Sequence, residues 1–338
     1  MKALNWSADE SRAVLRAMRT VATVDGSMPL DSVGKEMLEA TRDHVLHHDV
    51  VLDTLENITP EELAERLEGT QLRERALQFL VLTSYLPLEL DRDEVHVVDE
   101  FASALGVSTD MLRDLHRVRD HRLKWLAFDY VRRGLKAFLP HDSTWKRIRR
   151  IVSAMHQYVG DPVVAARYQA LEKLEEGTLG RGFFHFYRDR DFPLPGEKGG
   201  FSELFVSHDM THVLAGFNTD MDGEMNVAAF QAGMSRSDYG WEMLMEIILD
   251  YHLGLKFTTA GLVEPGRGHF HPEQALRGYE RGLRCNVDLI ADWDYWSVVD
   301  MPVDELRRRY NIDGVTTWRI PAPTSQAVTR GDDKQNGG

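Results

Sequence analysis

The chain has 338 residues, of which 43% are hydrophobic and 28% charged, a composition typical of a folded protein large enough for two cores. Its net charge of -14 argues against a nucleic-acid partner, because phosphate binding requires a concentrated positive surface. The single cysteine excludes an internal disulfide, the first residues lack the layout of a secretory signal, and no apolar run is long enough to span a bilayer. We therefore expect a cytoplasmic protein, and any membrane contact, at the inner membrane, would have to be peripheral.

Apolar residues recur at three- and four-residue spacing along almost the whole chain, which predicts an all-α fold. We expect two helical domains, residues 1–120 and 121–318, followed by a disordered polar tail, 319–338. Capping residues and prolines mark several helix starts, because a side-chain oxygen satisfies free amides and proline suits the first turn. These starts are Ser7, Thr59-Pro60, Ser108/Thr109 and Pro272.

The first domain contains a faint repeat at an offset of 60 residues, with MPLDSV from Met28 matching LELDRD from Leu88. The longer stretches VATVDGSMPLDSV and YLPLELDRDEVHVVDEFASALGVS resemble the TerB (tellurite resistance type) family of helical modules. The repeat predicts a bundle of two similar helical hairpins, and the resemblance implies a second metal site with oxygen ligands for a hard cation. Its acidic positions are Asp25, Asp91, Asp93 and Glu94. The alternative is that these acids favour helix N-termini and face solvent.

A connecting helical segment rich in Arg, Lys and Trp, residues 121–160, leads to the most informative stretch. His208 and His212 are four residues apart, so on a helix both imidazoles project from one face. Glu224 follows 12 residues after His212, and an uninterrupted helix would carry it about 18 Å away. Glycine, Asn and Asp residues between 216 and 223 predict a chain reversal, with a second helix starting near Asp222 that brings Glu224 back.

Two histidines with one or two carboxylates are typical of a catalytic site for zinc or another divalent metal, whereas structural zinc sites favour cysteine. Without Glu224 and the reversal, the histidine pair would be interpreted as a surface feature. A metalloprotease would carry His-Glu-x-x-His, with glutamate as general base. Asp209 occupies the glutamate position here, which disfavours that alternative.

The pattern His-Asp-x-x-His, eleven residues, then Glu resembles the metal motif of the coenzyme Q (ubiquinone) biosynthesis protein four family. Two further segments resemble the same family: LEEGTLGRGFFHFYRD from Leu174, and ALRGYERGLRCNVDLIADWDYWSVVDMPVDELRRRYNI downstream. The likeness covers about residues 125 to 315 in matching order. The fused TerB-like half and the Gly-rich insertion at 255–271 depart from the usual single-domain form, which leaves the substrate open.

The resemblance implies a protein that removes the C1 carboxylate of a polyprenylated hydroxybenzoate and replaces it with a hydroxyl. The implied cofactor is a divalent metal, first of all Zn2+, with His208, His212 and Glu224 as ligands. Asp209 would be a fourth ligand or the catalytic group that orients a metal-bound water. The implied partners are a prenylated quinone precursor or isoprenoid lipid and other quinone-biosynthesis proteins, and homo-oligomerisation is left open.

Three arginines at helical spacing form a cationic stripe suited to a carboxylate or a prenyl phosphate. They are Arg277, Arg281 and Arg284. The equal alternative is a solvated helix face with acidic partners such as Glu280. Whether the protein is an enzyme is also left open, because the alternative is a non-catalytic prenyl-lipid-binding or scaffold protein of quinone biosynthesis or of a metal stress response. A metal-dependent hydrolase lacks a general base beyond Asp209.

Overall fold

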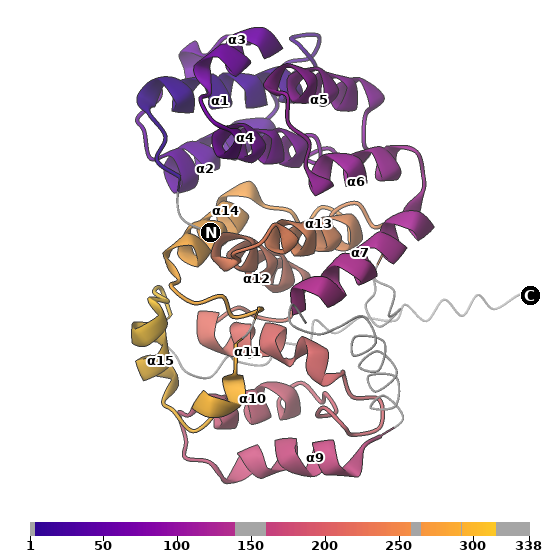
Figure 1. Cartoon of the computed structure of the whole chain (residues 1–338), viewed down its shortest axis with the longest axis vertical. Coiled ribbons are helices and arrows are strands. Elements are labelled where there is room, and N and C mark those ends of the chain that lie inside the picture. Colours follow the sequence, from indigo (N-terminus) through magenta and orange to yellow (C-terminus); the bar gives the residue numbers. More distant parts are fainter. Residues whose placement is uncertain (1–3, 139–159, 258–264, 292, 316–338) are drawn as a thin grey trace, which may run out of the picture.

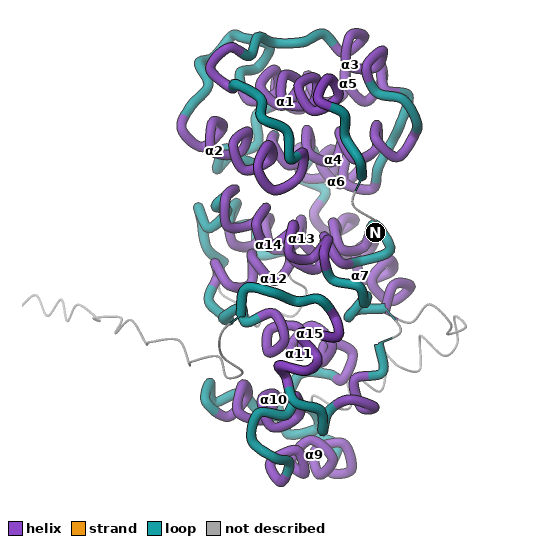
Figure 2. Tube along the Cα trace, turned by 90° about the vertical axis from the view of Figure 1, so that its left-hand side faces the viewer, coloured by secondary structure: helices purple, strands orange, loops and turns teal. Residues whose placement is uncertain are grey.

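The computed structural model describes residues 4–138, 160–257, 265–291 and 293–315. Within these ranges the chain consists of helices and loops, which confirms the predicted all-α fold. An isolated β-bridge joins Thr178 and Pro302. The helices stack into an elongated molecule, with α1–α6 at one end, α12–α14 in the middle, and α9–α11 and α15 at the other end (Figure 1, Figure 2). The predicted tail lies outside the described residues.

Capping residues begin the helices of the N-terminal part as the sequence predicts. Ser7 forms a reciprocal capping box with Glu10 at the start of the first helix, Thr59 caps a helix that opens on Pro60, and Thr109 caps another. The helices are α1 (Ala8–Ala22), α2 (Ser32–Thr41), α3 (Pro60–Arg66), α4 (Thr70–Thr83), α5 (Arg92–Leu105), α6 (Asp110–Arg119) and α7 (Leu123–Phe138). The faint repeat places corresponding residues, Asp31 and Asp91, at the N-caps of α2 and α5.

The remaining helices build the middle and the far end of the molecule. They are α9 (Pro162–Gln169), α10 (Leu179–Arg188), α11 (Val206–Ala215), α12 (Met221–Met234), α13 (Tyr239–Tyr251), α14 (Pro272–Arg284) and α15 (Val303–Tyr310). Helix α12 packs most extensively against α14 and α13. The backbones of α12 and α14 approach each other closely. A Cβ at Gly282 would collide with the carbonyl of Phe230, and a Cβ at Gly233 would collide with the carbonyl of Tyr279. Glycines therefore fix α12 at short distance from its neighbour.

Two buried apolar clusters hold the stack together. One joins the helices before residue 131 with residues of α12, α13 and α14, and the other joins α9–α11 with α15 and the far side of α12. Residues on the two sides of position 120 thus share one core, and the predicted division into two domains at that position stays a prediction. His44 adds a polar link, with ring nitrogens 2.8 Å and 2.9 Å from the carboxylates of Glu280 and Glu273 on α14.

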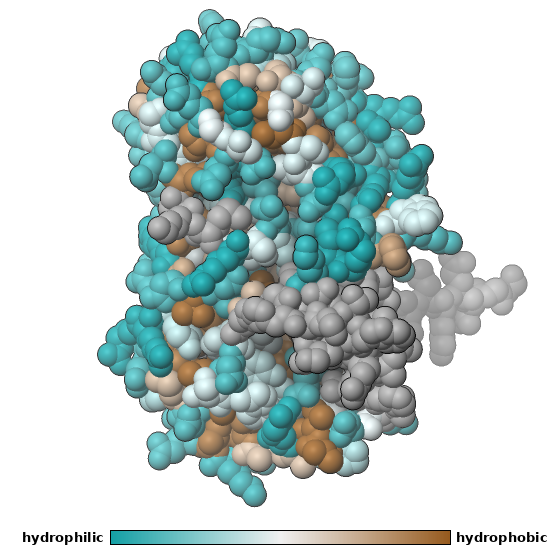
Figure 3. Space-filling view, viewed as in Figure 1, coloured by the Kyte–Doolittle hydropathy of each residue, from teal (hydrophilic) through white to brown (hydrophobic). Residues whose placement is uncertain are grey.

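The outer surface of the stack is mainly polar. Figure 3 shows hydrophilic side chains over most of one face, with smaller hydrophobic patches between them. None of the helices in the described ranges combines the length and apolar character needed to cross a bilayer.

Candidate metal centre

Helix α11 carries the two histidines, and its C-terminal end is held by groups distant in sequence. Its last carbonyls accept hydrogen bonds from Arg281, to Ala215 O at 2.7 Å, and from Arg307, to Leu214 O at 2.9 Å and Val213 O at 3.1 Å. Cations at this end also complement the negative pole of the helix dipole. Gly216 then adopts the left-handed conformation, with φ of 75°, and ends the helix. The position of the histidines is therefore fixed from outside their own helix.

The predicted reversal follows directly and is shorter than expected. Helix α12 begins at Met221, because the Asp220 carboxylate accepts a hydrogen bond from the Gly223 amide at 2.7 Å and caps the helix two residues before the predicted start at Asp222. Gly223 has to lack a side chain, since a Cβ would collide with the carbonyl of Asn218. The second helix therefore presents Glu224 within its first turn.

Glu224 reaches both histidines across this turn. One carboxylate oxygen lies 3.3 Å from Nε2 of His208 and the other lies 3.4 Å from Nε2 of His212. The two Nε2 atoms are 3.2 Å apart. One ligand atom from each residue lies within 4.8 Å of the others, and no second such cluster of His, Cys, Asp or Glu occurs in the described part of the chain. The structure brings together the three side chains that the spacing predicts.

The far side of each imidazole is anchored by an oxygen. Nδ1 of His208 lies 3.0 Å from Oε1 of the fully buried Gln231 on α12, and Nδ1 of His212 lies 3.2 Å from the carbonyl of Phe217. Both oxygens accept, so both Nδ1 atoms donate their N–H. In the neutral ring this leaves the Nε2 lone pair pointing into the cluster, which is the tautomer that a metal requires.

The cluster is electron-rich and shielded from water. Glu224 and His208 each keep 18% of their side-chain surface, and His212 keeps 1% with its ring stacked on Phe186. Burial disfavours the charged form of His208, but the Glu224 carboxylate outweighs burial and raises the pKa of His208 to about 9. Burial likewise opposes ionisation of Glu224, yet the two imidazoles hold its pKa well below the usual range. The site thus strongly favours a positive charge between these groups.

Asp209, the fourth residue of the motif, lies outside the three-residue cluster. Its carboxylate accepts a hydrogen bond from the hydroxyl of Tyr187 on α10, and burial raises the pKa of this carboxyl. Asp209 is therefore oriented by α10. Its predicted roles as a ligand or catalytic group stay predictions.

Two polar residues beside the cluster were missed by reasoning from the sequence. Gln231 follows Glu224 by seven residues, two helical turns along the same face, which is a signal that could have found it. Glu246 lies on α13, where burial and the nearby Asp250 raise its pKa to about 7, while the proximity of His208 lowers it. Nothing in the local sequence indicates Glu246, because the α13 packing that brings it near His208 is non-local.

The predicted arginine stripe is largely engaged with the protein itself. Arg281 donates to Ala215 O and to the carbonyl of Asp313, and its guanidinium lies 4.8 Å from the ring centre of Phe217. Arg284 pairs with Glu280 and with the Asp313 carboxylate, and Arg277 is exposed. Arg281 therefore supports the end of α11. A substrate-binding role for the three arginines stays a prediction.

The acidic residues of the predicted second metal site do not form a ligand cluster among the described residues. Asp25 lies in the turn after α1, and Asp91 caps α5 by accepting from the amide of Asp93 at 2.7 Å. Glu94 is buried, one of its oxygens has no hydrogen-bond partner, and burial together with Asp91 and Asp31 raises its pKa to about 8. Helix capping accounts for Asp91, as the alternative interpretation proposed.

Comparison with known proteins finds structural similarity to solved structures, whereas no protein-family model and no curated protein matches the chain in sequence. A solved structure from Nostoc punctiforme PCC 73102, of a protein whose given name assigns it provisionally to ubiquinone biosynthesis, is similar over 72% of this chain and 97% of that chain. The sequence identity is 18% and the TM-score is 0.33, and likeness at this level does not assign a function to this chain.

Proposed function

We propose that the chain binds one divalent metal ion, zinc first of all, through His208, His212 and Glu224. The observation that carries this proposal is the convergence of two Nε2 atoms and a carboxylate, with both Nδ1 atoms held by oxygen acceptors. Two imidazoles and one carboxylate, with further positions open, are the donor set of catalytic zinc sites. Without a metal ion, the raised pKa of His208 means that a proton on this ring balances the Glu224 carboxylate, and a divalent ion would take the place of that proton.

We further propose that this site serves quinone biosynthesis, acting at C1 of a polyprenylated hydroxybenzoate. Support comes from the resemblance of three ordered sequence segments, one of which contains all the cluster residues. A bound divalent ion would supply positive charge to a substrate oxygen as carbon dioxide leaves. Exchange of a carboxylate for a hydroxyl is an oxidation, so an oxidant must come from outside the described residues. The chain's own contribution is to bind and orient the ring and to exclude water from a largely buried site.

A substrate with a polyprenyl tail would reside in a membrane, so the protein would have to contact the membrane surface to bind it. Helix α7 has an exposed face that could make this contact. Trp125 and Phe128 are 69% and 64% exposed, and their rings pack edge to face. Arg122, which directly precedes α7, and Lys124 and Lys136 on α7 are also exposed. Exposed aromatic side chains flanked by cations are typical of helices that lie in the interface of an anionic membrane.

The membrane part is tested with vesicles containing anionic phospholipid. The Trp125→Ser/Phe128→Ser protein should float with the vesicles much less than the wild type, because it loses the two apolar anchors. Val163→Ser is the control, since Val163 is 81% exposed on α9, away from the aromatic pair. Equal flotation of the double variant and the wild type would remove α7 as the membrane contact.

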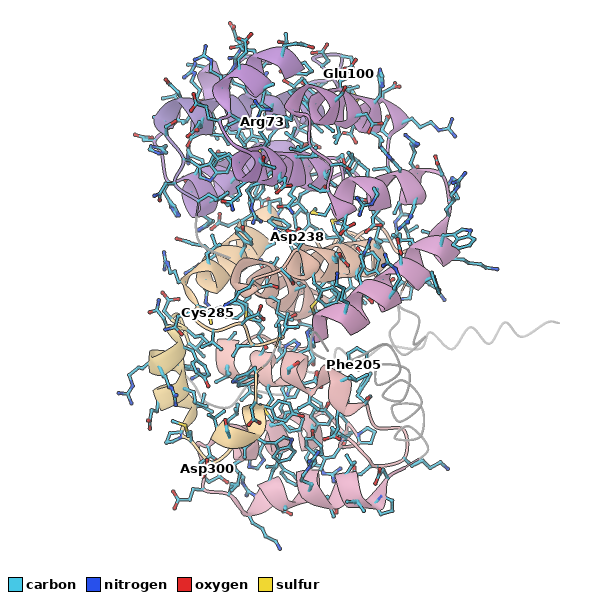
Figure 4. All side chains as sticks on the ribbon, in the orientation of Figure 1. Arg73, Glu100, Phe205, Asp238, Cys285 and Asp300 are labelled. Atoms are coloured by element: carbon cyan, nitrogen blue, oxygen red, sulfur yellow. The ribbon has the colours of Figure 1, made fainter. Side chains whose placement is uncertain are left out.

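The functional part is tested by complementation of a strain that lacks this gene. We expect the wild type to restore the quinone and the His208→Ala/Glu224→Ala variant to leave polyprenylated hydroxybenzoate accumulating, both measured by mass spectrometry of extracted lipid. The matched control is His96→Ala/Glu100→Ala, an exposed histidine–glutamate pair on α5 with a 3.6 Å contact (Glu100 is labelled in Figure 4). Rescue by the first variant contradicts a metal-dependent role. Unchanged quinone on deletion, with prenyl lipid bound to purified protein, favours the lipid-binding alternative.

A further inference from the structure

The N-terminal part of the molecule contains a cavity of its own, which is open to solvent. It has a volume of about 500 Å3 and lies between the end of α1, the turn that follows it, and the segment 55–57 before α3. This volume is in the range of sites that bind small organic molecules. None of the cluster residues on α11 and α12 lines it, and α1 and α11 lie in different parts of the stack (Figure 1). The cavity is thus separate from the candidate metal centre.

One arginine in this cavity is unlike its neighbour on the same helix. Arg16 donates from its guanidinium to the carbonyls of Glu56 and Asn57 and pairs with Glu62 at 2.6 Å. Arg19, which lines the cavity, has no hydrogen bond or ion pair from its side chain within the described ranges, and its Nε is buried without a partner. A partly buried guanidinium without a carboxylate or carbonyl is costly, and in a chain with an excess of acids it is unexpected.

The walls around Arg19 define what the cavity would accept. Met28 and Leu55 provide apolar surface, and Asn57 and Thr23 provide an amide and a hydroxyl that are hydrogen-bonded to each other at 3.2 Å. The exposed Glu56 also lines the cavity and disfavours a ligand of high negative charge. Guanidinium groups pair with carboxylates through two parallel hydrogen bonds. The cavity therefore suits one negative charge on an apolar body.

We propose that this cavity is a second ligand site, which binds a small organic monocarboxylate with Arg19 pairing to the carboxylate and Met28 and Leu55 contacting the apolar body. The Arg19 side chain makes no hydrogen bond or ion pair within the described residues that the ligand would have to break. The site is therefore ready to bind without rearrangement of an existing ion pair. It does not depend on the metal cluster, and the two proposals stand or fall separately.

The test is a fluorine NMR titration of para-fluorobenzoate into the full chain, with neutral para-fluorobenzamide titrated in parallel and inorganic phosphate added as a competitor of the benzoate. We expect saturable binding of the benzoate and at least about tenfold weaker binding of the other two, because each lacks either the charge or the apolar body. Arg19→Gln should weaken benzoate binding by about tenfold or more. The matched control, Arg12→Gln, removes the same charge from an exposed position of α1 outside the cavity and should bind like the wild type.

A second variant keeps the test decisive if the loss of Arg19 disturbs folding. Met28 is 55% exposed, so Met28→Glu should fold normally, and its carboxylate at the cavity rim should weaken benzoate binding more than Met28→Gln does. Metal content should be the same in all these variants. Wild-type protein that does not bind the benzoate saturably, equal binding by the Arg19→Gln variant, or phosphate binding as tight as the benzoate would each overturn the proposal.

Discussion

Gln231 offers the sharpest probe of the cluster, because it touches no proposed ligand atom yet decides which imidazole nitrogen carries the proton. Its Oε1 accepts from Nδ1 of His208 at 3.0 Å, and its side chain is fully buried. In Gln231→Leu this acceptor is lost, and the His208 proton can move to Nε2 and donate to Glu224 at 3.3 Å. The lone pair that would bind the metal is then occupied.

The expected magnitude follows from this exchange of tautomers. Loss of an oxygen that orients a metal-ligating histidine typically weakens metal binding by about 10- to 100-fold, or roughly 1.4 to 2.7 kcal/mol. Gln231→Glu should bind zinc at least as tightly as the wild type, because a carboxylate acceptor raises the basicity of the ring. The predicted order of affinity is Glu, then Gln, then Leu.

Competition between the protein and a chromophoric zinc chelator at fixed pH measures this order. Gln274→Leu is the control, since Gln274 is exposed on α14 and contacts Asn226 rather than a histidine. Thermal unfolding in the presence of a chelator checks that each variant is folded before metal is added. A folded Gln231→Leu protein with wild-type zinc affinity would refute the proposed role of the Nδ1 anchor.

Three further predictions concern the fold. Glu94 has a pKa of about 8 in the folded protein, above its value of 4.5 when unfolded. Its stabilising contribution is therefore complete below pH 4.5 and is lost as the pH rises through 8. Glu94→Gln should raise the urea midpoint at pH 9 and change it little at pH 5. Arg133→Met should cost about 3 to 5 kcal/mol in urea unfolding, because it leaves the buried Glu242, paired with Arg133 at 2.7 Å, without its counter-charge and leaves Asp114 with Arg117 alone among the described residues. Gly233→Ala should lower the melting temperature by several degrees, whereas Gly69→Ala, where a Cβ meets no atom within 4 Å, carries only the strain of its positive φ.

Local signals in the sequence were sufficient for the helices and for the cluster itself. Caps at Ser7, Thr59 and Thr109 are confirmed, as is the first-turn proline at 272, because capping depends on residues within a few positions. Glu224 meets His208 and His212 for a similar reason, since helical spacing and one tight reversal determine the geometry. Their role as metal ligands stays a prediction.

Long-range packing was not accessible from the sequence. Arg281 was expected on a cationic stripe that either binds substrate or faces solvent, and its hydrogen bond to the last carbonyl of α11, where Arg307 from α15 also donates, was not foreseen. The sharing of one core by the N-terminal helices with α12–α14 depends on contacts between distant segments, including the close approach at Gly233 and Gly282. The arginine contacts and this shared core join segments that are far apart in the sequence, so no local pattern of residues predicts them.

The packing of α10, α11 and α15 at the far end of the molecule also helps to position the residues of the candidate metal centre. Phe205, exposed and labelled in Figure 4, directly precedes α11, and Tyr187 of α10 orients the Asp209 carboxylate. Helices α10, α11 and α15 share one apolar cluster with Phe230 and Met234 of α12. The helix that carries the histidines is therefore supported by the apolar cluster at the far end, and α12, which carries Glu224, packs into both clusters.

Equilibrium dialysis against zinc, followed by elemental analysis, tests the central proposal most directly. We predict one tightly held zinc ion per wild-type chain, one in the His96→Ala/Glu100→Ala control, and none in folded His208→Ala/Glu224→Ala protein. A wild-type chain that retains no zinc or other divalent metal, or a double variant that retains as much as the wild type, would contradict a metal centre at these residues.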